Sequence, residues 1–77
     1  MALSELPVCS GLQAVNTLVR FGWVIIRRGT HIVFTKKGSK MHISIPNHKQ
    51  IDRSLLHDQL KKAGIEDKEF REIFDKF

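Results

Sequence analysis

The chain has 77 residues, of which 42% are hydrophobic and 27% charged, and its formal net charge is +5 at neutral pH. This composition indicates one small folded domain spanning residues 1–77 and excludes a disordered tail. No apolar stretch reaches the roughly 20 residues of a membrane span, the N-terminus lacks a signal-peptide pattern, and a single cysteine excludes a disulfide framework, so we expect a cytoplasmic protein.

Residues 1–9 read as a loose lead-in to a first helix. Ser10 is a preferred capping residue, and it predicts a helix that begins at Gly11. Gly22 suits the left-handed residue just beyond the helix end. The expected apolar face of this helix consists of Leu12, Val15, Leu18 and Val19.

Three short extended runs follow, at residues 23–28, 31–36 and 39–45, and they predict an antiparallel meander. Turns are expected at residues 29–30 and 37–38, and Pro46 ends the third run. If residues 37–38 form a two-residue turn, Phe34 lies opposite Met41 and Ile32 opposite Ile43. This register gathers the apolar side chains, including Ile25 and Ile45, on one face.

Two further helices complete the predicted fold. Asp52 caps the first, Gly64 terminates it and Ile65 follows, while its apolar residues are Leu55, Leu56, Leu60 and Ala63. The second, over residues 67–77, carries Phe70, Ile73 and Phe74. The sequence therefore predicts an α+β fold of order α-β-β-β-α, with a three-stranded antiparallel sheet, helices on one face and a short extra C-terminal helix.

The uncovered face of this sheet is expected to be basic. A tight turn at residues 29–30 places Arg28 across from His31, and the expected patch contains Arg28, His31, His42 and Ser44, flanked by Lys36, Lys37 and Lys40. Residues 1–51 hold seven basic side chains and one acid, whereas residues 52–77 hold six basic and seven acidic ones. Such a one-sided positive field attracts polyanions, and an open basic sheet suits RNA.

His31 is the candidate for proton transfer, because a histidine exchanges protons near neutral pH and this one follows the hydroxyl-bearing Thr30. By chemistry alone, a lone histidine on a strand is more often a surface residue. His48, after Pro46, is readable as a second proton-transfer group, as a contact for RNA or for a protein partner, or as an inert loop residue. The four histidines lack metal-ligand spacing, so we expect no metal and no cofactor.

Several segments in order resemble the HicA (YcfA-like) toxin family. They are Gly22-Trp23, then Arg27 and Gly29-Thr30-His31, then Ile45-Pro46-Asn47-His48, and finally Leu60-Lys61-Lys62-Ala63-Gly64-Ile65 and Glu69-Phe70. The similarity extends over about residues 6–74. Thr30 stands where the family usually has serine.

The resemblance implies a double-stranded-RNA-binding-domain-like fold, an mRNA-cleaving toxin and neutralisation by a HicB-like antitoxin. It implies that His31 is the catalytic residue, with Thr30 and His48 as auxiliary candidates. The expected RNA-binding residues are Arg27, Arg28, Lys36, Lys37, Lys40 and Lys49. Two alternatives stay open: a non-catalytic RNA-binding module of the same fold, and a protein-interaction domain whose basic face takes an acidic partner.

Overall fold

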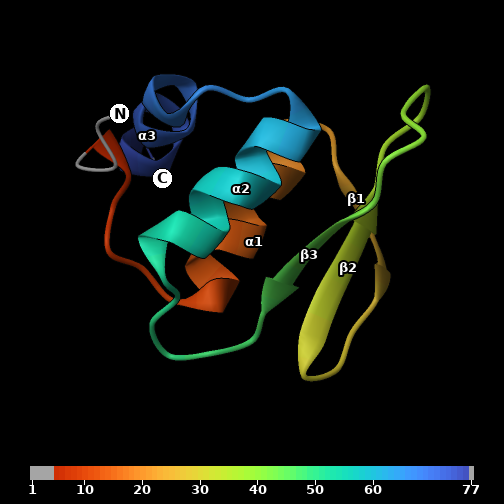
Figure 1. The fold of residues 1–77 in the computed structure, drawn as a ribbon, viewed down its shortest axis with the longest axis horizontal. Helices are drawn as coiled ribbons and strands as arrows, with labels where there is room; N and C mark the ends of the chain where they lie inside the picture. The colour runs from red at the N-terminus through yellow and green to blue at the C-terminus, as the bar shows by residue number, and fades with distance from the viewer. Residues whose placement is uncertain (1–4, 77) are drawn as a thin grey trace.

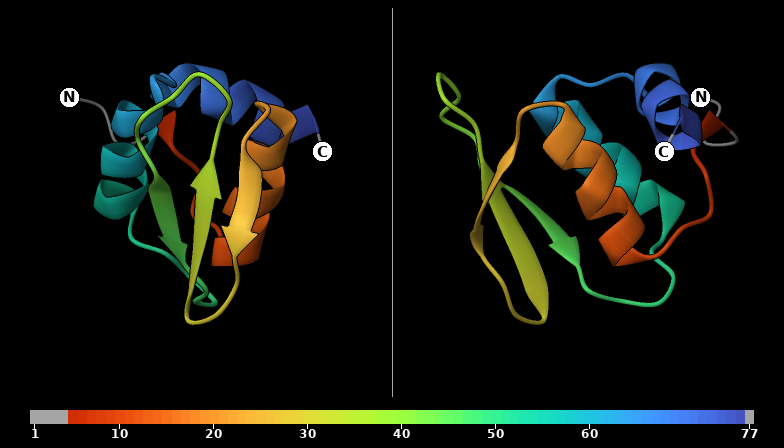
Figure 2. Two further views of the ribbon diagram at one scale, coloured as in Figure 1. Left: turned by 90° about the vertical axis from the view of Figure 1, so that its right-hand side faces the viewer. Right: turned by 180° about the vertical axis from the view of Figure 1, so that it is seen from behind.

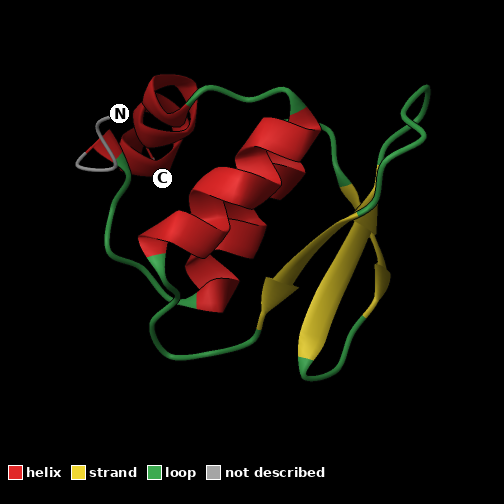
Figure 3. Cartoon of the chain, viewed as in Figure 1, coloured by secondary structure: helices red, strands yellow, loops and turns green. Residues whose placement is uncertain are grey.

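The structure, a computed structural model, describes residues 5–76. Its elements follow the chain as α1 (Gly11–Arg20), β1 (Val24–Arg27), β2 (His31–Thr35), β3 (Ile43–Pro46), α2 (Arg53–Ala63) and α3 (Asp67–Lys76) (Figures 1 and 3). This order confirms the predicted α+β fold, which is compatible with a double-stranded-RNA-binding-domain-like architecture. Residue 77, the last of the predicted C-terminal helix, lies outside the described residues. Within residues 5–76, no helix has the length and apolar character needed to cross a membrane.

The molecule is layered, with the sheet on one side and the helices on the other. The strands pair in the order β1-β2-β3, antiparallel throughout. Figure 2 shows α1 and α2 behind one face of this sheet and no helix over the other face. The covered face buries Ile32, Phe34, Ile43 and Ile45 completely or nearly so, as the alternation of the sequence predicts.

Helix α1 begins as predicted, and Val15 and Leu18 are buried as predicted, but the other half of the predicted apolar face is exposed. Ser10 accepts a hydrogen bond from the Gln13 amide, and the Gln13 side chain accepts one from the Ser10 amide, which is a complete capping box. Two predicted core residues, Leu12 and Val19, are 51% and 47% exposed. They each follow a buried residue, Gly11 and Leu18, by one position, which is about 100° around the helix.

The N-terminal segment is not a loose lead-in where the structure describes it. Leu6 is fully buried and Cys9 nearly so, both within the core, and the Cys9 carbonyl accepts a hydrogen bond of 2.9 Å from the Ile51 amide. The chain before α1 therefore packs against the loop before α2. Residues 1–4 of the predicted lead-in lie outside the described residues.

Strand β3 is displaced by two residues from its predicted register. Phe34 pairs with Ile43 rather than Met41, and Ile32 pairs with Ile45 rather than Ile43. The turn at Lys36–Ser39 has a positive φ at Gly38 alone, whereas the turns that suit two-residue hairpins need one at the first central residue. The strands therefore separate beyond Phe34, and Met41 is exposed. A two-residue displacement preserves the buried face.

Strand β1 contains a bulge that overturns the expected position of Arg28. Ile25 pairs with Phe34, but Arg27 pairs with Val33, so Ile26 is the extra residue. Arg28 is consequently not opposite His31. It instead lines a groove of about 1020 Å³ with residues of α1, including Gln13 and Asn16, on the helix side of the sheet.

Helix α2 has the predicted ends, and α3 begins at the predicted Asp67. Asp52 accepts a hydrogen bond from the Ser54 amide, and Gly64 is left-handed with φ 74°, which lets the Ile65 amide bond the Leu60 carbonyl. His57 of α2 lies 2.9 Å from Asp67, the first residue of α3. This ion pair joins the two helices and accounts for a histidine that the sequence left without a role.

Candidate functional site

Two loops meet at one end of the sheet, and His31 lies between them. We call this the hairpin end: Arg27 to His31 at the β1–β2 turn, and residues 47–49 directly after β3. His31 is the first residue of β2 and pairs with Pro46, the last residue of β3. Beyond that pair, the Asn47 amide donates to the Thr30 carbonyl at 2.9 Å. The β-ladder therefore continues into the two loops and holds them together.

The first turn of α1 holds the second of these loops. The Gly11 amide donates a hydrogen bond of 2.8 Å to the His48 carbonyl. A Cβ at residue 11 would stand 2.1 Å from the Pro46 carbonyl oxygen, so only glycine permits this approach. The backbone of His48 is thus fixed, while its side chain is exposed. The bottom of Figure 1 shows the two loops and the start of α1 gathered together.

The His31 side chain is accessible to a ligand. It is exposed, and it makes no hydrogen bond or ion pair with any residue between 5 and 76. Successive residues of a strand point to opposite faces, so residues two positions apart share a face. His31 therefore shares the uncovered face with Val33 and with the partner of Val33, Arg27. Residues 6–51 contain no carboxylate, so the nearest charged side chains in sequence are cations.

The remaining predicted lysines and His42 lie at the other end of the sheet. Residues 36–42 form an extended loop there, and we call its residues 36–40 the lysine loop because they include Lys36, Lys37 and Lys40 (Figure 1). The displaced register moves His42 outside the paired region, beyond the last pair of Phe34 and Ile43. The single patch expected from the sequence is therefore two: a hairpin end with His31, and the lysine loop.

The cations of the hairpin end and the lysine loop differ in their contacts and in the face they occupy. Lys36 places its ammonium nitrogen 5.9 Å from the centre of the buried Trp23 ring, a cation–π contact that also anchors the lysine loop. Lys37, Lys40 and Lys49 are exposed. Arg27 faces the open side of the sheet and Arg28 the helix side, so of these two predicted phosphate-binding arginines only Arg27 lies on the open face.

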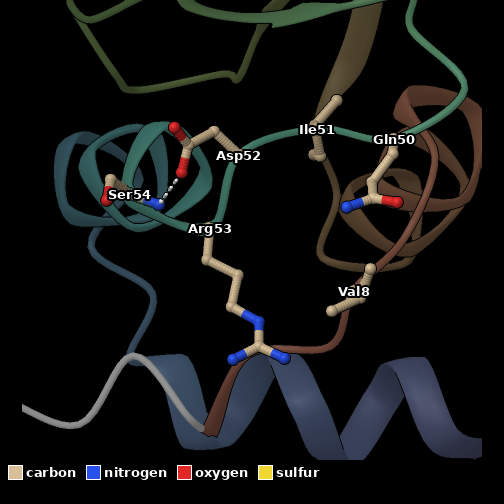
Figure 4. Close-up of a pocket in the computed structure, with 6 residues that line it drawn as sticks. All are labelled: Val8, Gln50, Ile51, Asp52, Arg53 and Ser54. Atoms are coloured by element: carbon tan, nitrogen blue, oxygen red, sulfur yellow. Dashed lines mark hydrogen bonds between the residues drawn. The ribbon is translucent and has the colours of Figure 1, made fainter.

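A hollow of about 570 Å³ lies beside the loop that leads into α2, between that loop and Val8 (Figure 4). The Arg53 side chain extends into it away from the Asp52 carboxylate, which already accepts from the Ser54 amide. The Arg53 Nε is buried and makes no hydrogen bond within the described chain. Neither His31 nor His48 lines this hollow, so it is separate from the hairpin end.

Two residues that position the site have no obvious signature in the sequence. Gly11 supports the His48 loop, and its only signal is a glycine at the first position of a capped helix. Gln59 of α2 accepts a hydrogen bond of 3.0 Å from the Ser44 amide, which closes the outer edge of β3. A glutamine on a helix does not reveal such a contact until the helix is packed.

Comparison with known proteins identifies the chain. No curated protein and no solved structure matches it significantly. The sequence does match the family described as HicA toxin of bacterial toxin–antitoxin, over residues 13–65. The match runs from α1 to the residue after Gly64 and includes every residue of the hairpin end and the lysine loop. The chain therefore belongs to the HicA toxin family of bacterial toxin–antitoxin systems.

Proposed function

We propose that this protein is a metal-independent endoribonuclease that cleaves mRNA, with His31 transferring a proton at the scissile phosphate. The observation that carries the proposal is an exposed, unpaired imidazole at the first position of β2, on the uncovered sheet face and among cations. Membership in a toxin family supports a harmful activity, and an open cationic sheet supports a polyanionic substrate.

Phosphate contacts hold the RNA and carry little sequence information. At the hairpin end, Arg27 lies on the open face and Lys49 is exposed in the loop after β3, while Lys37 and Lys40 extend the positive charge to the lysine loop. A strand of RNA that crosses the sheet would meet cations at both ends of its path. Arg27 is the candidate to stabilise the extra negative charge on phosphorus during reaction.

His31 has two chemically sensible tasks in RNA cleavage. As a base it would take the proton from the ribose 2′-hydroxyl, whose oxygen then attacks phosphorus; as an acid it would protonate the departing 5′-oxygen. Either task belongs to a reaction that forms a 2′,3′-cyclic phosphate and a 5′-hydroxyl end. Thr30 supports His31 through its backbone, since its carbonyl is held by the Asn47 amide.

We also propose a HicB-like antitoxin as the protein partner, one that covers the hairpin end. Such a partner would exclude RNA from His31, and acidic side chains on it would complement residues 6–51, which carry no acid. This binding accounts for neutralisation without any change in the toxin itself.

The direct test compares His31→Ala with His42→Ala, because both residues are exposed histidines and only His31 lies at the hairpin end. Induced expression and purified protein with EDTA provide growth and RNA-cleavage readouts. We expect His31→Ala to lose both activities and His42→Ala to retain them. Intact cleavage by a folded His31→Ala variant contradicts the proposal. Salt-sensitive RNA binding by the wild type without any cleavage would favour the non-catalytic module.

A further inference from the structure

We infer that His48 is the second proton-transfer residue and that His31 and His48 act as an acid–base pair on one phosphodiester. This inference rests on the proposed ribonuclease function and supplies the group that one histidine cannot provide. Cleavage through the 2′-oxygen needs one group to remove a proton and another to deliver one. With no metal in the proposed reaction, both must be side chains.

The histidines are the side chains whose ordinary titration falls near neutral pH, and the chain has four. His57 is paired with Asp67 at 2.9 Å, between α2 and α3. His42 precedes Pro46 by four residues of extended chain, which is about 13 Å along the sheet. His48 follows Pro46 by two residues, so its Cα lies within about 7 Å of that of Pro46.

Pro46 is the residue directly opposite His31, with an expected Cα separation of about 5 Å. His31 and His48 therefore approach the same end of the sheet from two different strands. A phosphate group between two imidazoles requires this arrangement, with one imidazole on each side of phosphorus. Both side chains are exposed, and neither has a partner within residues 5–76.

Two backbone hydrogen bonds hold the chain around His48. Asn47 bonds Thr30, the neighbour of His31, and the His48 carbonyl accepts from Gly11 at the start of α1. Two backbone hydrogen bonds thus fix the separation of the two histidine backbones, while neither bond uses an imidazole. Preorganisation of this kind keeps two reacting groups at a productive distance.

The step balances with these two groups alone. The base accepts the 2′-hydroxyl proton as the 2′-oxygen bonds to phosphorus. The bond from phosphorus to the 5′-oxygen breaks, and that oxygen takes a proton from the acid. The products are a 2′,3′-cyclic phosphate and a 5′-hydroxyl, and proton exchange with water returns both imidazoles to their starting states.

The test uses single-turnover cleavage of an RNA oligonucleotide that spans a mapped cut site, with His48→Ala and His48→Gln variants and His42→Ala as the control. General acid–base catalysis typically contributes about 10²- to 10⁴-fold, so we expect both His48 variants to lose at least 100-fold in rate with little change in RNA affinity. The wild-type pH–rate profile should have two limbs, and each His48 variant should lose one.

A second substrate identifies which of the two histidines is the acid and which is the base. When sulfur replaces the bridging 5′-oxygen, the leaving group departs without protonation, so the variant that lacks the acid should recover and the other should not. Rescue of only one of His31→Ala and His48→Ala supports the pair, and rescue of neither overturns it. Cleavage by His48→Ala within threefold of wild type also overturns it, while loss in His31→Ala would leave the proposed function standing.

Discussion

Gly11 links the stability of the fold to the geometry of the candidate site. Its amide holds the His48 carbonyl, and its missing side chain leaves room for the Pro46 carbonyl. The residue stands outside the part of the chain that matches the toxin family, which begins at residue 13. At the scale of single residues, positioning of the site therefore depends on a backbone contact as well as on the histidines.

Gly11→Ala should destabilise the protein by about 1–3 kcal/mol, because the new Cβ forces the Pro46 backbone to move. It should also slow RNA cleavage, since the same movement displaces His48. Chemical denaturation and single-turnover assays measure the two effects. Gly29→Ala is the matched control for stability: nothing lies within 4 Å of its Cβ, so we expect a change within about 0.5 kcal/mol. Equal effects of the two substitutions would contradict this account.

Cys9 gives a pH-dependent prediction at the same scale. Burial raises the pKa of its thiol above the ordinary value of 9.0, so the folded protein favours the neutral thiol. Ionisation of the thiol leaves stability unaffected below pH 9, and stability falls as the pH rises from 9.0 through the raised pKa of the folded state. We expect slow iodoacetamide labelling at pH 8 in the folded state and rapid labelling in urea.

The unfolding free energy should also fall more steeply above pH 9 in wild type than in Cys9→Ala, which has no thiol to ionise. Identical pH dependence in the two proteins, or equally fast labelling with and without urea, would show that Cys9 is not held in the core.

The lysine loop and the hairpin end are separate elements, so substitutions should separate binding from cleavage. Lys37→Ala with Lys40→Ala should weaken RNA binding and reduce the slope of log affinity against log salt by about 1.4, at roughly 0.7 per phosphate contact with single-stranded RNA. The cleavage rate of bound RNA should change little, because neither lysine is near His31.

The control pair is Lys61→Ala with Lys62→Ala, which removes the same charge from exposed positions at the end of α2. That pair should leave the salt slope nearly unchanged. An equal loss of affinity in both pairs would mean that RNA responds to net charge rather than to the lysine loop.

Periodicity predicted which elements form and which face of the sheet is buried, but it did not predict how the strands align. A two-residue displacement of β3 leaves Ile43 and Ile45 buried, so the apolar pattern alone does not distinguish the two registers. In the predicted register His42 lies opposite Val33, two residues from His31. The observed turn at Gly38 moves it away and splits the expected basic patch.

The bulge at Ile26 likewise moves Arg28 away from its predicted position opposite His31. The predicted pairing holds for Val24 and Ile25 and fails beyond them. The extra residue in the bulge shifts the pairing by one position, so the residues that follow point to the opposite face from the one predicted. No residue type around Ile26 indicates a bulge at this position. The position of His31 was predictable because it depends only on the start of β2, whereas its neighbours depend on contacts between strands.

At the scale of the whole molecule, the distribution of charge follows the two layers of the fold. The sheet and its loops carry cations and no carboxylate, while the acids of the described chain lie at Glu5, Asp52 and Glu66 and along α2 and α3. Figure 2 shows these helices on the far side of the sheet from its open face. The division leaves one face for a polyanion, and under the proposed function we expect RNA and an acidic antitoxin surface to compete for it.

The end groups of cleaved RNA test the central proposal most directly. Wild-type protein in EDTA should produce 2′,3′-cyclic phosphate and 5′-hydroxyl ends, and His31→Ala should produce none above background under the same conditions. Fragments that carry 3′-hydroxyl and 5′-phosphate ends, or the same cyclic ends formed at the wild-type rate by His31→Ala, would contradict proton transfer by His31.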